Sequence, residues 1–518
     1  MPPPDERPVA VIEIGSSAIH LTVAQATRGD TPAWNVVEDL TRGIRISKDA
    51  VSQGAISRET VDEVLSVLKL WKRTCEANDV ARIRTVVTSG VLEASNAEIF
   101  LDNLRTFAGL DPEPLSTIQE TAWLYLALRG REGAPGRVGP QAMLKVGAAT
   151  SLLTVFDSSL ILAQITLPLG LVRMRQIFES LPQREMDFGA YLEASIDHEL
   201  RLMEDALPVR RVEQVYGFGN ELEAMRSAMG FKAGDPPFAR ERLGPFLDGV
   251  AELGRDGLCR RHGVPYDLTE HFHPAGRILD RVAAWFDCRT VELAPVTLRD
   301  GLVPEFHQGG PGPEDLARRE RQLHADALAV GRAFRFDERH ASSVAEYSLT
   351  LFDLTQDVHR LGPRERQWLM AAALLHDVGY AISYNAHHKH SHYIIQSRDF
   401  FYLSDAERSI IALAARYHRK AGPKATHVEF ENLSRADRMT VLKLASMLRI
   451  AEALDYSRDH RVASLHARRE PGRIVLCCTI ADQIFGEIYS FNDKKELFEE
   501  LFGLRLSIET APLPGAAP

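Results

Sequence analysis

The chain has 518 residues, too many for one hydrophobic core, so its length predicts several domains. A composition of 45% hydrophobic and 25% charged residues is typical of a globular protein and excludes a disordered or fibrous one. The net charge of -10 argues against non-specific DNA binding, so local basic residues or bound metal must attract any polyanionic ligand.

The sequence carries no signal for a membrane or an exported location. No apolar run approaches the ~20 residues that cross a bilayer, and residues 1–8 lack the basic and apolar regions of a signal peptide. The five cysteines show no CxxC spacing, which favours free thiols in a reducing compartment. We therefore expect a cytoplasmic protein with no membrane association and no DNA partner.

The first half of the chain alternates predicted strands and helices. Apolar runs at 9–14 and 20–24 flank Gly-Ser-Ser and predict a β-hairpin. A helical pattern follows at 57–77, and then a β-like segment at 83–88. Residues 144–156 repeat the opening pattern around Gly-Ala-Ala-Thr-Ser, which predicts two similar α/β lobes.

The second half is predicted to be mainly helical. The breaker-rich segment 307–314 (HQGGPGPE) is the best candidate for a linker. Helix-like apolar spacing then recurs at 315–334, 341–360, 363–375, 405–418 and 434–453. The end is predicted as a strand at 473–480, a helix at 493–502, a strand at 504–509 and a disordered tail at 510–518.

A carboxylate and a small-residue turn follow the first strand, in Glu13-Ile-Gly-Ser-Ser-Ala18. Backbone amides in such turns face phosphate groups in many proteins, although the same residues also form plain hairpin turns. The segment resembles the first phosphate motif of the exopolyphosphatase / guanosine pentaphosphate phosphohydrolase (Ppx/GppA) family. Further segments resemble that family in its own order: Thr88-Ser-Gly-Val-Leu-Glu-Ala94, Thr117-Ile-Gln-Glu-Thr-Ala-Trp-Leu124, Lys145-Val-Gly-Ala-Ala-Thr150, Leu167-Pro-Leu-Gly-Leu-Val-Arg173, Gly217-Phe-Gly219 and Leu298-Arg-Asp-Gly-Leu302.

The resemblance implies two actin-like (RNase H-like) lobes with a phosphate-binding cleft between them. It implies that Glu120 is the catalytic base, a role that suits a carboxylate. The residues that it assigns to phosphate binding are Glu13, Gly15, Ser16, Lys145, Gly147, Thr150 and Gly219. The implied activity is release of terminal phosphate from inorganic polyphosphate or guanosine pentaphosphate, with a homodimer as a possible assembly.

Several residues depart from the family pattern. Lys145 and Glu13 each stand where the family has aspartate, and Leu92 stands where it has arginine. Ala148 and Ala149 replace two glycines of the second phosphate loop, which limits close backbone approach. Two outcomes stay open: Lys145 contacts phosphate directly in place of a cation, or the cleft binds without turnover.

A second set of residues has the chemistry of a metal site. His376 and Asp377 end an apolar helical segment, His340 lies on an earlier one, and Asp455 ends a later one. This order resembles the HD metal-phosphohydrolase superfamily and implies an all-α bundle with these four residues as ligands. A divalent ion is the implied cofactor, with Mg, Mn or Fe as candidates.

Two histidines in segments that resemble the same superfamily, His390 and His418, are candidate ligands of a second metal. They are equally compatible with direct contact to phosphate. Arg416, Arg419 and Lys420 form a basic patch beside His418 that either binds a polyanion or is a solvated face.

The predicted fold is therefore α/β plus all-α. Its parts are lobe I (1–125), lobe II (126–306), an HD-type helical metal domain (315–465) and a small α/β C-terminal segment with a tail (466–518). The leading function is an exopolyphosphatase-like phosphohydrolase acting in the cleft. One alternative places catalysis in the HD site and leaves the cleft as a polyphosphate or alarmone sensor. The other is a non-catalytic binding protein.

Overall fold

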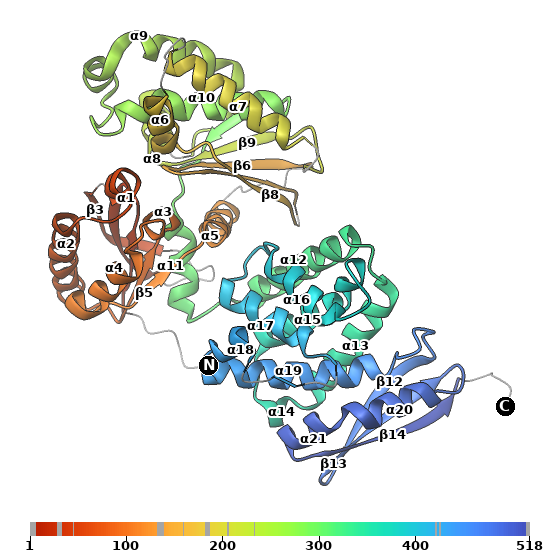
Figure 1. Ribbon diagram of the computed structural model, residues 1–518. Coiled ribbons are helices and arrows are strands. Elements are labelled where there is room, and N and C mark those ends of the chain that lie inside the picture. The colour runs from red at the N-terminus through yellow and green to blue at the C-terminus, as the bar shows by residue number, and fades with distance from the viewer. Residues whose placement is uncertain are drawn as a thin grey trace. The chain divides into compact units, whose positions relative to one another are not determined.

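The chain forms two compact units, Met1–Gly312 and Pro313–Pro518, and their division falls within the predicted linker segment. Figure 1 shows the computed structural model. It describes residues 7–27, 34–44, 46–131, 139–158, 160–181, 187–204, 207–232, 234–419, 422–423 and 426–513. Among these residues, no helix is both long enough and apolar enough to cross a bilayer.

The first lobe is built on a five-stranded sheet of order β3-β2-β1-β4-β5. Its strands are β1 (Val9–Ile14), β2 (Ala18–Ala26), β3 (Trp34–Gly43), β4 (Arg82–Val87) and β5 (Pro112–Pro114). Its helices are α1 (Ile46–Gln53), α2 (Arg58–Ala77), α3 (Ser89–Leu92), α4 (Ala97–Asn103), the π-helix η1 (Leu104–Ala108) and α5 (Thr117–Gly130). The predicted hairpin is confirmed, because β1 pairs antiparallel with β2. The predicted first helix is also confirmed: it begins after Ser57, whose side chain accepts from Thr60 N.

The second lobe is built on a six-stranded sheet of order β10-β11-β9-β6-β7-β8. Its strands are β6 (Gln141–Val146), β7 (Ser151–Phe156), β8 (Ile161–Leu167), β9 (Gln214–Phe218), β10 (Phe238–Ala239) and β11 (Thr290–Leu293). Its helices are α6 (Leu171–Ser180), α7 (Phe188–Leu202), α8 (Asn220–Ala228), the 3-10 turn η2 (Arg240–Arg242), α9 (Leu243–His262) and α10 (Thr269–Trp285). Its first hairpin repeats the turn of the first lobe. Gly15 N donates to Ala18 O at 2.9 Å, and Gly147 N donates to Thr150 O at 3.1 Å.

The helix α11 (Leu298–Gln308) returns the chain to the first lobe, where it packs on α5 and β1. Gly301 makes this approach possible, because a Cβ there would lie 2.2 Å from the carbonyl oxygen of Trp123. The predicted boundary at residue 306 assigned this segment to the second lobe. The structure corrects that assignment, because Leu298, Leu302 and Val303 share an apolar core with β1.

The second unit is a helical bundle followed by a three-stranded sheet of order β12-β13-β14. Its bundle consists of α12 (Pro313–Ala333), α13 (Glu338–Leu354), α14 (Gln356–His359), α15 (Pro363–Leu375), the 3-10 turn η3 (Val378–Ala381), α16 (His387–Gln396), α17 (Asp405–Arg416), α18 (Val428–Glu431) and α19 (Arg435–Ala453). The last part consists of β12 (Val462–Glu470), β13 (Arg473–Ile480), α20 (Phe485–Lys494), α21 (Glu496–Phe502) and β14 (Arg505–Pro512). The bundle is centred on α15, whose residues Trp368 to Leu375 are all buried.

The structure differs from the predicted elements of this unit at four places. The expected helix 341–360 is two helices, because α13 ends at Leu354 and α14 begins at Gln356. The expected helix 493–502 covers only the end of α20 and then α21. The predicted boundary at 465 cuts through β12, a strand that the pattern did not predict because its exposed residues are polar. Residues 510–512 of the predicted tail pair with β13, and 514–518 lie outside the described residues.

Candidate functional site

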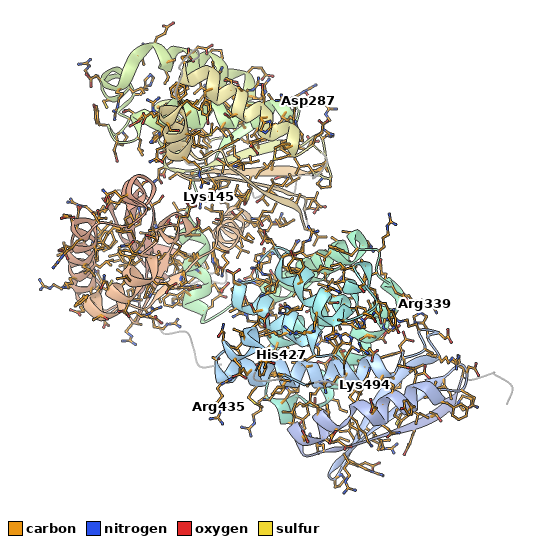
Figure 2. All side chains as sticks on the ribbon, viewed as in Figure 1. Lys145, Asp287, Arg339, His427, Arg435 and Lys494 are labelled. Carbon is orange, nitrogen blue, oxygen red and sulfur yellow. The ribbon has the colours of Figure 1, made fainter. Side chains whose placement is uncertain are left out.

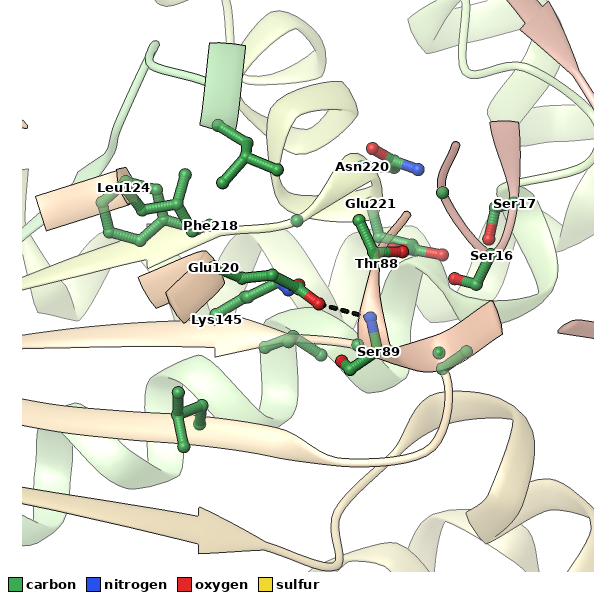
Figure 3. Close-up of a pocket in the computed structure, with 18 of the residues that line it drawn as sticks. Ser16, Ser17, Thr88, Ser89, Glu120, Leu124, Lys145, Phe218, Asn220 and Glu221 are labelled. Atoms are coloured by element: carbon green, nitrogen blue, oxygen red, sulfur yellow. Dashed lines mark hydrogen bonds and ion pairs between the residues drawn. The ribbon is translucent and has the colours of Figure 1, made fainter. Parts of the chain in front are cut away.

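A cavity of about 210 Å³ lies at the small-residue turns that follow β1 and β6 (Figure 3). Lys145, labelled in Figure 2, lies where the two lobes of this unit face each other. The cavity is lined by every residue that the sequence assigned to the cleft: Glu13, Gly15, Ser16, Glu120, Lys145, Gly147, Thr150 and Gly219. The fold therefore brings these residues together, and their individual roles stay predictions.

Glu120 is fixed beside the cavity by the start of α5. The side chains of Ser116 and Gln119 cap this helix, which places Glu120 in its first turn. Glu120 is only 1% exposed. Its Oε1 accepts a hydrogen bond of 2.6 Å from Ser89 N, and its Oε2 contacts the ammonium group of Lys145 (Figure 3). A backbone donor and a cation together hold this carboxylate in one orientation.

The cavity contains a second carboxylate with its own basic partner. Glu13 Oε2 lies 3.1 Å from Nη1 of Arg299, a residue of α11 that is 8% exposed. Burial lowers the pKa of Lys145 to about 8, against the opposing field of Glu13. Because Glu13 and Glu120 each contact a cation of the chain, a divalent ion would have to displace one of these partners. A metal in the cleft would therefore require Lys145 or Arg299 to move away from its carboxylate.

The third small-residue turn of the cavity requires glycine. Gly219 has a φ of 139°, and a Cβ there would lie 2.7 Å from the carbonyl oxygen of Val146. The turn leads directly into α8, so its amides lie at a helix N-terminus beside the cavity. Backbone amides in this position are suited to phosphate oxygens.

Sequence reasoning missed several titratable residues of this cavity, among them Arg299, His20 and Glu221. Arg299 lies within a segment that resembles the family but was not predicted as a site residue, although it pairs with Glu13. His20 lies on β2 opposite Glu13, and burial lowers its pKa. Glu221 extends into the cavity from α8, and burial raises its pKa to about 7 (Figure 3). The segment Leu298-Arg-Asp-Gly-Leu302 was the available signal for Arg299; His20 and Glu221 had none.

A cluster of histidines and one aspartate lies inside the helical unit. Two groups have ligand atoms within 4.8 Å of one another, and Asp377 belongs to both. The first group is His340, His376 and Asp377, and the second is Asp377, His387 and His418. All of these residues are buried, and they come from the ends of α13, α15, α16 and α17.

The histidines of this cluster are oriented by the contacts of their Nδ1 atoms. Nδ1 of His376 lies 2.7 Å from Ala373 O, and Nδ1 of His418 lies 2.6 Å from Ala415 O. Nδ1 of His340 lies 2.7 Å from an Asp455 oxygen. Because a ring nitrogen bonded to an acceptor carries the proton, Nε2 is left with a free lone pair. Among the described residues, Nε2 of His340 and of His376 have no hydrogen-bond partner in the protein.

The pKa shifts at this cluster also favour cation binding. Burial lowers the pKa of His376 to about 4 and that of His418 well below its usual value, so both rings are neutral at pH 7. Burial alone would raise the pKa of Asp377, but the neighbouring imidazoles and Arg458 hold it well below its usual value. Neutral imidazoles directed at an ionised carboxylate are a fitting donor set for a divalent transition metal.

The structure differs from the predicted ligand set at two residues. Asp455 does not belong to either group and instead accepts from His340 Nδ1 and from His460 N. His387, the first residue of α16, belongs to the second group, whereas the predicted ligand His390 lies almost one turn further along that helix and is partly exposed. The spacing His-His-Lys-His allowed either residue, and the packing of α16 brings His387 to Asp377.

The predicted basic patch is only partly described. Arg416 lies 3.4 Å from a Glu429 carboxylate oxygen, so its charge already has a partner. Arg419 is exposed, and Lys420 lies outside the described residues. The patch therefore gives no independent indication of a ligand.

The fold defines a class of protein. Two α/β lobes, each opening on a hairpin around a small-residue turn, enclose a cavity in the actin-like architecture. The model of the Ppx/GppA phosphatase family matches residues 22–307, and that of Ppx/GppA phosphatase domain III matches residues 321–475. The chain therefore belongs to the Ppx/GppA phosphatase family.

The chain is similar to a guanosine-5'-triphosphate,3'-diphosphate pyrophosphatase of Photobacterium profundum, with 23% identity over 468 residues, 87% of each chain. A solved Ppx/GppA family member of Aquifex aeolicus has 20% identity and a TM-score of 0.50; the match covers 59% of this chain and 99% of that one. An exopolyphosphatase of Cytophaga hutchinsonii has 16% identity and a TM-score of 0.52, with the same coverage. The two structures support the fold of the α/β unit.

Proposed function

We propose that this chain hydrolyses phosphoanhydride bonds of inorganic polyphosphate or guanosine pentaphosphate in the cleft of its α/β unit, with Glu120 as the general base. One observation carries this proposal. The Glu120 carboxylate is buried at the cavity between a backbone donor, Ser89 N, and the Lys145 ammonium. Family membership supports the reaction class, because the matched model is that of a phosphatase family.

The charges of the cavity suggest how a phosphate chain is bound. An incoming phosphate competes with Glu120 for Lys145, because both are anions that need the same ammonium. Once Lys145 turns to phosphate, Oε2 of Glu120 accepts a proton from water, while Oε1 stays on Ser89 N. The water oxygen attacks the terminal phosphorus, and the bridging P–O bond breaks. The turns at Gly15, Gly147 and Gly219 line the cavity and offer backbone amides to the phosphate oxygens.

A second candidate function rests on the metal-type cluster of the helical unit. We propose that His340, His376, Asp377, His387 and His418 form an HD-type centre that binds one or two divalent ions. The free Nε2 atoms of His340 and His376 favour this reading, because buried nitrogen lone pairs without a partner are costly. A bound ion would supply Lewis-acid chemistry toward a phosphoester, while Asp455 orients His340. The cleft would then act as a sensor of polyphosphate or of an alarmone.

Two variants of the full chain separate these functions in an assay of phosphate release from polyphosphate and guanosine pentaphosphate. Glu120→Gln is expected to lower turnover by about 10³-fold, because it removes the base and keeps the shape. His376→Ala with Asp377→Ala is expected to leave turnover unchanged and to remove bound metal. Glu93→Gln is the matched control, because Glu93 lines the same cavity but is exposed; it should stay within about threefold.

The other outcomes of this assay favour other functions. If the double variant loses turnover and Glu120→Gln keeps it, catalysis belongs to the helical unit. If polyphosphate binds and neither variant changes a measurable turnover, the chain is a binding protein. We also propose that the protein acts in the cytoplasm, where its free cysteines would remain reduced.

A further inference from the structure

Asp377 bridges the two halves of the histidine cluster, with one oxygen directed at each half. Its Oδ2 lies 3.5 Å from His376 Nε2 and 3.8 Å from His340 Nε2. Its Oδ1 lies 3.3 Å from His387 Nε2 and 3.6 Å from His418 Nε2. Any ion held by His340 and His376 must therefore take Oδ2 as its carboxylate ligand.

One cation of the chain already contacts this oxygen. The Arg458 guanidinium pairs with Oδ2 of Asp377, and it lies 4.9 Å above the ring of Tyr380. Tyr380 in turn stacks on His387, with ring centroids 4.0 Å apart. Arg458 therefore covers the outer side of the cluster, and its side chain is 35% exposed. Among the described residues, no other arginine or lysine forms an ion pair with Asp377.

The loop that carries Arg458 is tied to the same cluster. Arg458 N donates to Asp455 O at 3.0 Å, and His460 N donates to Asp455 Oδ1 at 3.1 Å. Arg458 itself has a φ of 59°, in the left-handed region that costs energy for a residue with a Cβ. The strained backbone at Arg458 therefore places its guanidinium beside Asp377.

From this geometry we infer that Arg458 is a built-in competitor of the first metal ion and, once displaced, the phosphate ligand of the loaded centre. The inference rests on the proposed metal centre. The guanidinium and a divalent ion cannot both use Oδ2 of Asp377 at close range, because like charges repel. After displacement, Arg458 keeps the face of Tyr380 as a second contact and lies at the solvent side, where a phosphate group would arrive.

The test measures binding rather than turnover. Mn²⁺ affinity and stoichiometry are determined by calorimetry on the full chain, and then inorganic phosphate affinity on the Mn²⁺-loaded protein. Arg458→Ala is expected to bind the first Mn²⁺ about tenfold more tightly, because the competing cation is gone. The same variant, once loaded, is expected to bind phosphate about tenfold more weakly. Arg458→Lys keeps the charge without the planar fork, so its Mn²⁺ affinity should lie between the two.

Arg461→Ala is the matched control. Arg461 lies on the same loop and loses the same charge, but it contacts Asp459 and Gln483 O rather than Asp377. It should leave both affinities unchanged. Equal Mn²⁺ affinity in wild type and Arg458→Ala overturns the competition, and equal phosphate affinity overturns the second role. If the wild type binds no Mn²⁺ at all, the metal centre itself is wrong, which is a distinct result.

Discussion

The cleft of the α/β unit and the histidine cluster of the helical unit surround their carboxylates with different groups. In the cleft, Glu13 and Glu120 each contact a basic side chain of the chain itself. In the cluster, four imidazoles present Nε2 to one carboxylate, and their proton-bearing nitrogens face outward. The carboxylates of the cleft are each paired with a cation, whereas around Asp377 the Arg458 guanidinium is joined by four imidazole nitrogens, the donors that a transition metal prefers.

This difference shows why the departures from the family pattern are informative. Lys145, which the resemblance places where the family has aspartate, contacts Glu120 in the fold. Its ammonium is therefore an internal cation beside Glu120. The cluster retains its histidines and Asp377, so the two regions predict opposite responses to metal removal and to mutation.

The largest effect is expected when the cleft loses its internal cation. Lys145→Met leaves the Glu120 carboxylate buried without its partner, and breaking such a pair costs about 3–5 kcal/mol of unfolding free energy. Urea denaturation followed by tryptophan fluorescence measures this loss. The double variant with Glu120→Gln should recover most of it. A loss below about 0.5 kcal/mol in the single variant would show that the pair is not formed.

The next effect concerns the choice between His387 and His390 as a metal ligand. His387→Ala removes a nitrogen of the second group and should weaken Mn²⁺ binding there by about 100-fold. Equilibrium dialysis against Mn²⁺ gives the affinity and the stoichiometry. His390→Ala on the same helix is the control and should change neither value. The reverse result would return the ligand role to His390.

A third variant tests whether packing positions the second group. A Cβ at Gly379 would lie 2.1 Å from His387 O and 2.5 Å from Ser391 N, so Gly379→Ala must shift α16. We expect a loss of about 2 kcal/mol in stability and about a tenfold loss in Mn²⁺ affinity. Gly422→Ala, where a Cβ would meet nothing within 4 Å, should be nearly neutral. Equal behaviour of both variants would contradict the role of Gly379.

The smallest effect follows from the pKa of Lys145, which burial lowers to about 8. The ammonium is present below this pH and is lost as the pH rises through it. Polyphosphate affinity of the cleft should therefore fall by about fourfold between pH 7.0 and 8.5, the ratio of protonated fractions for that pKa. Fluorescence titration at constant ionic strength measures it. Lys145→Arg should bind equally at both pH values, and a pH-independent wild type would exclude Lys145 as the phosphate cation.

Much of the architecture was determined by local sequence. The hairpin at 9–14 and 20–24, the helix after Ser57 and the helix 363–375 were predicted because apolar periodicity and caps are local signals. The order of the small-residue turns also led to the cleft residues, which the fold gathers around one cavity. Chain order alone could not reveal that α11 returns to the first lobe, because its partners on α5 and β1 are distant in sequence.

Tertiary structure alone decided how the charges meet. The sequence named Glu120, Lys145, His376 and Asp377, but it gave no sign that Lys145 contacts Glu120, that Asp455 supports His340 or that Arg458 reaches Asp377. These contacts join residues from separate elements, and the energy of a charge depends on its distance from other charges and from water. The sequence specifies the residue types, whereas the distances between these residues are set only when the chain packs.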